Sequence, residues 1–284
     1  SADHEFVLLT GSANRPLAEE IGKILKTEVH YPITRFSNGE TRVVGPFMRD
    51  REVFVIQPTY PNVDRMYMEA FIMADAAKRA HAKKRILTTH YFAFGRQDRK
   101  DQPHTAVSAK LMANLIEASG YGHVVTMDMH ADQQDGFFEI DYDNLQGSYC
   151  LIPCLRQLSI PNLKFASPDL GGATRARAFN RRLDGNGIVI GNKEREHEAH
   201  NKSKTSELIG ENEVEGYNFV IIDEQIDTAG SITDTAILLK KFGAGSIVAA
   251  ATHGVFSGPA LERIADSPIN KIYITNSIQQ SVVD

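Results

Sequence analysis

Two adjacent carboxylates, Asp223 and Glu224, directly follow an apolar run in the stretch FVIIDEQIDTAGS, residues 219–231. A carboxylate at neutral pH only accepts hydrogen bonds, so this pair suits two vicinal hydroxyls, contacted directly or through a divalent cation. The apolar run predicts a buried strand that ends at Ile222. Ligands of α/β sheets bind at the carboxyl ends of parallel strands, which is where this pair would lie.

The second half of the same stretch has the composition of an anion-binding loop. Small side chains let backbone N–H groups approach an anion, and a helix beginning near Ser231 would add its positive end. A phosphate cradle a few residues from a grip on a diol indicates a ribose 5-phosphate site, whereas the alternative is a solvated acidic loop before a capped helix. The cradle residues are Asp227, Thr228, Ala229, Gly230 and Ser231.

Two further groups of side chains could act on phosphates or a metal. Arg96, Arg99 and Lys100 place three cations after an apolar strand, where a triphosphate could dock, although a basic surface turn would look similar. His130 follows another strand, and a neutral imidazole near Asp128 and Asp169 could meet Mg²⁺ or a phosphate oxygen. A lone histidine is otherwise more often structural.

A third feature is the charged segment GNKEREHEAHNKS, residues 191–203, which has almost no apolar anchor. A segment of this composition cannot bury itself, so we expect it to be mobile in the free protein. The alternative interpretation is a disordered connector.

These residues would be positioned by alternating strands and helices, which predict parallel sheets with helices on both faces. Apolar β-rich runs occupy residues 6–10, 53–57, 86–91, 124–127, 164–167, 188–190, 219–222, 247–251 and 272–275. Helical periodicity marks residues 15–25, 66–80, 105–118 and 231–242. A boundary near residues 145–149 would give two domains, 1–146 and 147–284.

Composition limits the classes of partner. A net charge of -5 and a pI near 6.1 argue against nucleic acid or a polybasic membrane binder. The N-terminal residues do not resemble a signal peptide, and no apolar run has the length of a membrane span. The two cysteines, Cys150 and Cys154, are expected to be reduced, buried apolar filler. We therefore expect a soluble, cytoplasmic protein.

The loop IIDEQIDTAGS resembles the loop that binds phosphoribosyl diphosphate in type I phosphoribosyltransferases and in ribose-phosphate diphosphokinase, also called phosphoribosyl-pyrophosphate synthetase. Five further segments, in the same order as in that diphosphokinase family, select it. They are RFSNGE (35–40), YFAFGRQDRK (91–100), TMDMHADQQDGFF (126–138), SPDLGGATRARAF (167–179) and ATHGVFSG (251–258).

The resemblance implies an α/β fold of two phosphoribosyltransferase-like domains, each a mainly parallel sheet flanked by helices. It implies transfer of the β,γ-diphosphate of MgATP to the C1 hydroxyl of ribose 5-phosphate, with release of AMP. ATP would bind on the side of residues 1–146, and ribose 5-phosphate on the side of residues 147–284. The family also implies a homo-oligomer, a hexamer or a dimer.

Site residues follow from the same resemblance. Lys193 and Arg195 match the family's flexible catalytic loop, and His130 and Asp169 match its magnesium site. ATP would be bound by Phe36, Asn38, Glu40, Arg96, Gln97, Arg99 and Lys100. Ribose 5-phosphate would be bound by Asp223, Glu224 and the cradle residues.

Four departures from the family pattern leave alternatives open. Asn38 and Glu224 stand where the family usually has aspartate, Glu194 separates the two catalytic cations, and the chain ends soon after residues 272–275. Asn38, Glu194 and the short C-terminal end favour a non-catalytic, regulatory homologue that binds catalytic subunits. The retained Lys193, Arg195, His130 and Asp223 count against that alternative. An ordinary phosphoribosyltransferase is a second alternative, but it would have no need of RFSNGE or GRQDRK.

Overall fold

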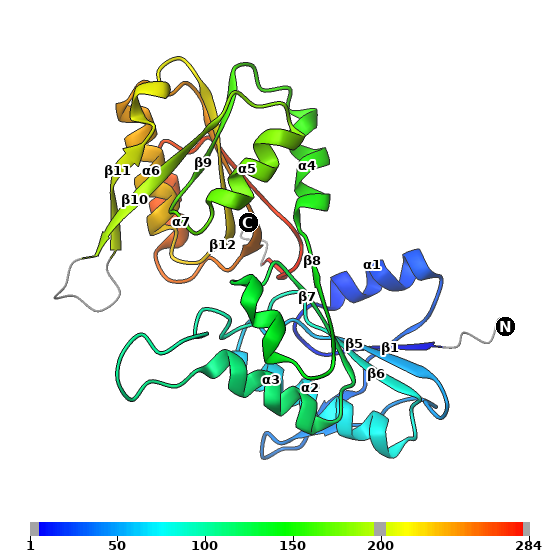
Figure 1. The fold of residues 1–284 in the computed structure, drawn as a ribbon. Helices are drawn as coiled ribbons and strands as arrows, with labels where there is room; N and C mark the ends of the chain where they lie inside the picture. Colours follow the sequence, from blue (N-terminus) through cyan, green and yellow to red (C-terminus); the bar gives the residue numbers. More distant parts are fainter. Residues whose placement is uncertain (1–5, 196–202, 281–284) are drawn as a thin grey trace. The chain divides into compact units, whose positions relative to one another are not determined.

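The structure is a computed structural model that describes residues 6–195 and 203–280, with the backbone alone at residues 193–195 and 203–206. The chain divides into two compact units (Figure 1). The first comprises the described residues up to Gln146 together with those from Asn276 onward, and the second is Gly147–Thr275. The residues after Thr275 thus belong with the first unit, whereas we had placed them in the second domain.

The first unit contains a six-stranded sheet in which all neighbouring strands are parallel, in the order β2-β1-β5-β6-β7-β8. Its strands are β1 (Phe6–Thr10), β2 (Val29–His30), β5 (Glu52–Ile56), β6 (Lys84–Thr88), β7 (His123–Met127) and β8 (Asp141–Leu145). The helices are α1 (Arg15–Leu25), α2 (Val63–Arg79), α3 (Ser108–Ser119) and the 3₁₀ helix η1 (Asp132–Phe137). A separate antiparallel pair is formed by β3 (Ile33–Arg35) and β4 (Thr41–Val43).

The second unit contains another six-stranded sheet, in the order β11-β10-β9-β12-β13-β14, in which only the β10–β11 pair is antiparallel. Its strands are β9 (Leu163–Ser167), β10 (Ile188–Arg195), β11 (Ser203–Ile209), β12 (Asn218–Ile226), β13 (Ile247–Gly254) and β14 (Lys271–Ile274). The helices are α4 (Ser148–Gln157), α5 (Ala173–Arg182), α6 (Gly230–Lys241), α7 (Ala260–Ala265) and the 3₁₀ helix η2 (Glu211–Glu213).

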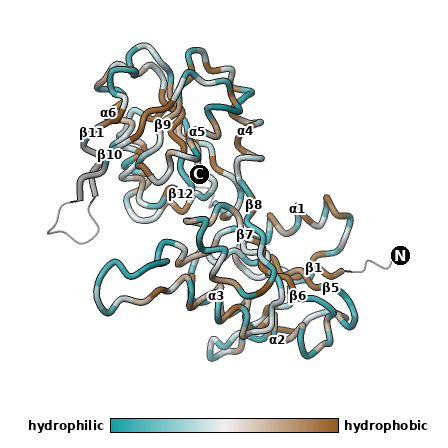
Figure 2. The backbone as a smooth tube through the Cα atoms, viewed as in Figure 1, coloured by the Kyte–Doolittle hydropathy of each residue, from teal (hydrophilic) through white to brown (hydrophobic). Residues whose placement is uncertain are grey.

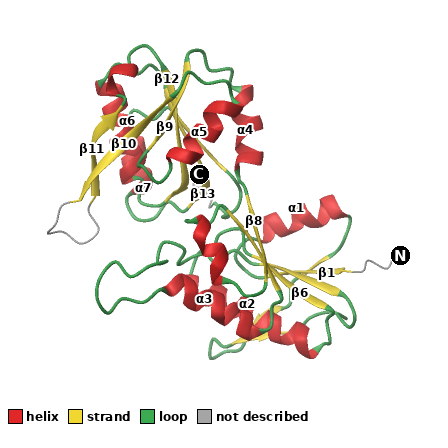
Figure 3. Cartoon of the chain, in the orientation of Figure 1, coloured by secondary structure: helices red, strands yellow, loops and turns green. Residues whose placement is uncertain are grey.

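Strand β12 shows why this sheet is covered on both faces. Phe219 and Ile221 lie in one buried cluster with residues of α6, whereas Val220 and Ile222 lie in another with residues of α4 and α5. Successive strand residues point to opposite faces, so an unbroken apolar run requires helices on both sides. Figure 2 shows hydrophobic residues along the strands, and Figure 3 shows the helices beside them.

The predicted fold class is confirmed: each unit is a mainly parallel sheet flanked by helices. Helix α1 has the predicted bounds. The expectation that both cysteines are buried is wrong, because Cys150 is exposed on α4 and Cys154 is half-buried; both thiols are free. The buried face of α4 is formed by Leu151, Ile152 and Leu155, and Cys150 lies outside it. No helix of the described residues is long and apolar enough to cross a membrane.

Candidate active site

The candidate sugar-phosphate site is built at the end of β12. This strand continues to Ile226, so Asp223 and Glu224 lie on the strand rather than in the loop that we expected after Ile222. The reason is that the neighbouring strand β13 also continues, and Asp223 pairs with Ala251 in parallel register. The backbone N–H of Glu224 also donates to Oδ1 of Asp223 at 2.8 Å.

Arg175, on α5, is a member of this site that the sequence did not reveal. Its Nη2 lies 3.5 Å from Oε2 of Glu224. Burial, followed by the charge of Glu224, raises the pKa of Asp223 to about 7, and Arg175 opposes that shift. Asp169 adds a further raising effect on this pKa. The site thus holds more carboxylates than cations, which is the balance expected where a divalent cation or several hydroxyls bind.

The loop after β12 has the geometry of an anion cradle. Ala229 precedes α6 with a left-handed φ of 62°, which is uncommon for a residue other than glycine. The backbone N–H groups of Thr228 and Ala229 have no hydrogen-bond acceptor in the described part of the chain. Together with the N-terminus of the 12-residue helix α6, they form a row of donors available to an anion.

Asp169 lies in a second loop of the same unit, between β9 and α5. Its Oδ1 accepts a hydrogen bond from the backbone N–H of Gly172 at 3.1 Å, and its carbonyl accepts one from Oγ of Ser167 at 2.7 Å. Strand β9 is the parallel neighbour of β12. The Asp169 loop and the cradle therefore emerge at the same edge of the sheet, where α/β folds bind ligands.

In the first unit, the structure brings His130 beside the loop that holds the predicted triphosphate residues. The carbonyl of Gly95 accepts a hydrogen bond from Nε2 of the buried Gln134, and a methyl group added at Gly95 would lie 3.7 Å from Cβ of His130. The loop follows β6 and His130 follows β7, which are parallel neighbours. The exposed cationic and amide side chains here are Arg96, Gln97, Arg99 and Lys100.

The segment RFSNGE forms the turn between β3 and β4. Phe36 is 52% exposed, and the guanidinium of Arg42 lies 5.9 Å from the centre of its ring. Oδ1 of Asn38 accepts a hydrogen bond from the backbone N–H of Glu40 at 3.1 Å, and Gly39 has a φ of 90°. The amide at position 38 thus shapes the turn, leaving its NH₂ group toward solvent or a ligand.

Arg35, at the start of this turn, forms an ion pair with a buried carboxylate that the sequence analysis did not identify. Glu69, on α2, is fully buried and forms an ion pair with Arg35 at the end of β3. It also accepts hydrogen bonds from Oγ of Ser12 and from Nε2 of Gln57, at 2.8 and 2.9 Å. Arg65 lies 3.3 Å away on the same helix. This network connects the β3–β4 turn to the core of the first unit.

The candidate catalytic cations lie at the end of β10. Lys193 pairs with Thr205 and Arg195 with Ser203, after an irregularity at Asn192. The segment that we expected to be mobile thus begins and ends as strand, because β11 provides a backbone partner. Its middle, residues 196–202, lies outside the described residues.

Within the described residues, no group of three or more His, Cys, Asp or Glu side chains has the arrangement of a metal site. His130 belongs to the first unit and Asp169 to the second, so each is described within its own unit.

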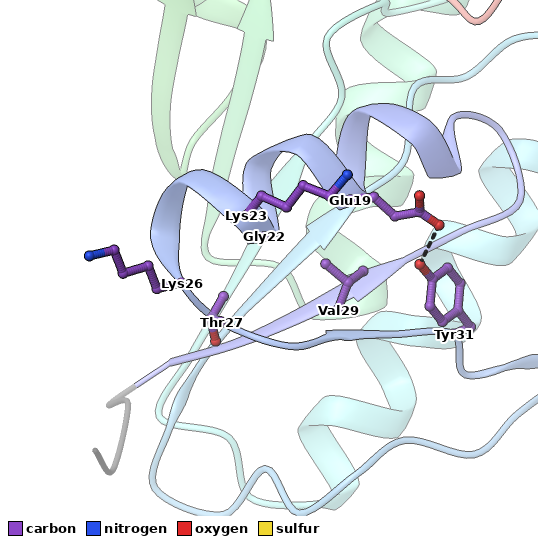
Figure 4. A pocket seen from close by; sticks show the side chains of 7 residues that line it. All are labelled: Glu19, Gly22, Lys23, Lys26, Thr27, Val29 and Tyr31. Carbon is purple, nitrogen blue, oxygen red and sulfur yellow. Dashed lines mark hydrogen bonds between the residues drawn. The ribbon is translucent and has the colours of Figure 1, made fainter. Parts of the chain in front are cut away.

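A pocket of about 420 Å³ lies apart from the predicted site residues, between the end of α1 and β2 (Figure 4). In this pocket the Tyr31 hydroxyl donates a hydrogen bond to Oε1 of Glu19 at 2.8 Å, and this bond raises the pKa of Tyr31. Lys23 and Lys26 also line the pocket. Because the last carbonyls of α1 carry partial negative charge, this position does not favour an anion.

Comparison with known proteins agrees with this architecture. A family model described as the N-terminal domain of ribose phosphate pyrophosphokinase matches residues 6–120, and another, the phosphoribosyl synthetase-associated domain, matches residues 194–284. The ribose-phosphate pyrophosphokinase of Helicobacter hepaticus is 44% identical over 275 residues, covering 96% of this chain and 87% of that protein. That of Synechococcus elongatus is 39% identical over 279 residues, covering 97% and 83%.

A solved structure gives the same result. The crystal structure of phosphoribosylpyrophosphate synthetase from Mycobacterium smegmatis matches with a TM-score of 0.88 at 28% identity, covering 98% of this chain and 90% of that chain. The fold and the site define a two-unit α/β protein whose candidate ligand loops follow parallel strands. The chain belongs to the ribose-phosphate pyrophosphokinase family, as its sequence motifs predicted, and is an enzyme of that family.

Proposed function

We propose that this chain transfers the β,γ-diphosphate of MgATP to the C1 hydroxyl of ribose 5-phosphate, giving phosphoribosyl diphosphate and AMP. The observation that carries the proposal is the cradle after β12, where the N–H groups of Thr228 and Ala229 have no acceptor among residues 6–195 and 203–280, together with the carboxylates of Asp223 and Glu224. Family membership over nearly the whole chain supports it.

In this proposal the second unit binds the sugar phosphate. The N–H groups of the cradle bind the 5-phosphate, with the positive end of α6 behind them. Asp223 and Glu224 accept hydrogen bonds from the ribose hydroxyls, and Asp227 contributes at the start of the loop. Arg175 limits the repulsion between these carboxylates by pairing with Glu224.

The first unit binds the nucleotide. The exposed ring of Phe36 offers a face on which adenine can stack, and Asn38 and Glu40 offer polar groups to its exocyclic amine. Arg96, Gln97, Arg99 and Lys100 would contact the triphosphate, because guanidinium and ammonium groups donate to phosphate oxygens.

Mg²⁺ fits the donor groups that are present. Burial, followed by the charge of Glu224, raises the pKa of Asp223, and a divalent cation beside this carboxyl would favour its ionised form. Asp169, in the second unit, offers a carboxylate oxygen, the kind of ligand that Mg²⁺ prefers, and we propose it and, in the first unit, His130 as magnesium-binding residues. The bound ion would supply charge neutralisation on the phosphates.

The remaining chemistry is positioning. Phosphoryl transfer requires in-line alignment and cations over the developing charge, with little covalent work for the protein. We propose that Lys193 and Arg195 provide these cations from the β10–β11 hairpin and help to exclude water that would hydrolyse ATP.

The test is to measure AMP and phosphoribosyl diphosphate formed from ATP and ribose 5-phosphate, with and without Mg²⁺. We expect both products in equal amounts, only when all three components are present. AMP without the sugar product would indicate hydrolysis instead. Complete absence of both products would favour the regulatory homologue.

The cellular setting rests on the resemblance and the composition alone. We propose a cytoplasmic homo-oligomer, a hexamer or a dimer, with no nucleic-acid or membrane partner. Analytical ultracentrifugation at micromolar concentration tests the assembly, and a monomer would contradict it.

A further inference from the structure

ATHGVFSG, residues 251–258, is one of the segments that resemble the family, and it has no role in the proposed chemistry described above. In the structure its first four residues are the end of β13, and the next three donate backbone hydrogen bonds to the end of β12 and the residue after it. The N–H groups of Val255 and Phe256 both donate to the carbonyl of Ile226, at 2.9 and 3.0 Å, and the N–H of Ser257 donates to the carbonyl of Asp227 at 2.9 Å. This segment therefore binds two successive carbonyls, that of Ile226 before the cradle and that of Asp227 at its start.

The next carbonyl is held by a side chain. Arg263, on α7, donates from Nη1 to the carbonyl of Thr228 at 3.0 Å. Its side chain is exposed, and the same Nη1 would lie 3.4 Å from a methyl group added at Gly230. The guanidinium thus lies against the backbone where the loop becomes helix α6.

These bonds fix the direction of the opposite groups. A trans peptide is planar, so the N–H of each residue points away from the carbonyl of the residue before it. Holding the carbonyls of Asp227 and Thr228 on one side therefore turns the N–H groups of Thr228 and Ala229 to the other side. These are the two N–H groups that have no acceptor among the described residues.

The hydrogen bond from Arg263 also polarises the Thr228–Ala229 peptide and supports the backbone conformation of Ala229. A peptide whose carbonyl accepts from a cation is polarised, so its N–H becomes a stronger donor. The same peptide leads into Ala229, whose left-handed φ of 62° would otherwise be disfavoured for a residue with a Cβ. The guanidinium compensates for that cost in the folded state.

We propose that Arg263 is a positioning residue for ribose 5-phosphate: it holds the Thr228–Ala229 peptide so that its N–H faces the 5-phosphate. Arg263 acts through the backbone and needs no contact of its own with the substrate. The inference rests on the proposed function of the cradle, and it assigns the specific role of phosphate recognition to a residue 32 positions beyond Ser231 in the sequence.

The test compares Arg263→Ala and Arg263→Lys with the unmodified protein in the AMP-release assay. For Arg263→Ala we expect KM for ribose 5-phosphate to rise about tenfold, as for the loss of one charge-assisted hydrogen bond, with KM for ATP unchanged. Calorimetry with ribose 5-phosphate alone should show the same loss of affinity. Arg263→Lys should recover part of it, and added guanidinium should restore affinity to Arg263→Ala.

Two reference variants make the result specific. Glu262→Ala removes an exposed charge at the neighbouring position of α7 and should change neither KM. Asp227→Ala alters the cradle itself and should weaken ribose 5-phosphate binding. An unmodified protein that makes no AMP contradicts the proposed function. An active protein whose KM for ribose 5-phosphate is unchanged in Arg263→Ala, or changes equally for both substrates, overturns the inference alone.

Discussion

At the scale of single residues, Asp223 is placed under opposing influences. Burial and the neighbouring Glu224 favour its protonated form, and Arg175 together with the N–H of Glu224 favours the ionised form, with burial the stronger influence. A carboxyl with a pKa of about 7 loses its proton readily when hydroxyls or a cation approach. The ionised form of Asp223 is therefore disfavoured in the free protein, and a ligand that favours this form would remove that cost.

This arrangement predicts a pH-dependent gain in stability for Asp223→Asn. The pKa of Asp223 is higher in the folded protein than the ordinary 3.8, so the folded state binds more protons between these values and stability falls as pH rises through that window. The variant lacks this loss. In urea unfolding with EDTA, the unfolding free energy of Asp223→Asn relative to that of the unmodified protein should rise between pH 5 and pH 8. The rise should be at most about 3 kcal/mol, and less because the side chain is partly exposed.

The test is the difference between the change in unfolding free energy at pH 8 and the change at pH 5. The substitution also alters hydrogen bonding, but this contribution is the same at both pH values and cancels in the difference. Glu262→Gln, at an exposed position, is the control and should show no such difference. An Asp223→Asn effect that is the same at pH 5 and pH 8 would mean that the carboxyl is already ionised at pH 5.

At the scale of elements, apolar patterning was sufficient for the strands in the middle of each sheet. Residues such as Phe219 and Ile221 are buried on one face and their neighbours on the other, so the composition of the strand is dictated by its surroundings. Strands β8 and β11 lie at sheet edges, and their polar residues gave no such pattern. Their pairing depends on partners that are distant in the sequence.

The sequence predicted the loops of the candidate site but not the residues of distant helices that contact the site. Its loops follow apolar strands and carry small or charged residues, so motif spacing located the cradle and the loop of Arg96. Arg175 and Arg263 were missed because each lies on a helix distant in sequence from the residue that it contacts, with no local pattern to indicate the contact. Glu69 was missed because a glutamate within a helical pattern usually faces solvent.

Glu69 also gives a prediction for an element, the β3–β4 turn that carries RFSNGE. Glu69→Gln should cost about 3 kcal/mol of unfolding free energy, because it leaves Arg35 without its buried partner and places an NH₂ group among donors from Ser12 and Gln57. KM for ATP should rise and KM for ribose 5-phosphate should not, since the turn belongs to the first unit. Urea titration and steady-state kinetics measure the two effects.

Helix α2 offers a matched control for this substitution. Asp75→Asn removes a carboxylate from the same helix, where it forms an exposed pair with Arg79 four residues away. Exposed pairs contribute little to stability, so the control should unfold close to the unmodified protein. Equal, small effects of the two substitutions would show that the buried network does not support the turn.

At the scale of the whole molecule, the proposal divides the reaction between the two units. The nucleotide residues, among them Phe36 and Arg96, belong to the first, whereas the cradle and the β10–β11 hairpin belong to the second. A substitution that affects binding should therefore act on one substrate. A substitution in a group that acts on both substrates at once should affect turnover instead.

Lys193 is the residue for which this distinction is sharpest. It is proposed to approach the transferred diphosphate only as charge develops, so Lys193→Ala should lower kcat by about two to three orders of magnitude, the usual loss for one such donor. The affinity for ribose 5-phosphate, measured by calorimetry, should stay within about twofold, because the cradle does not include Lys193. Lys204→Ala on the paired strand β11 is the matched control and should retain turnover. If Lys193→Ala instead weakened ribose 5-phosphate binding and left kcat intact, the hairpin would be part of the sugar site and not a source of transition-state charge.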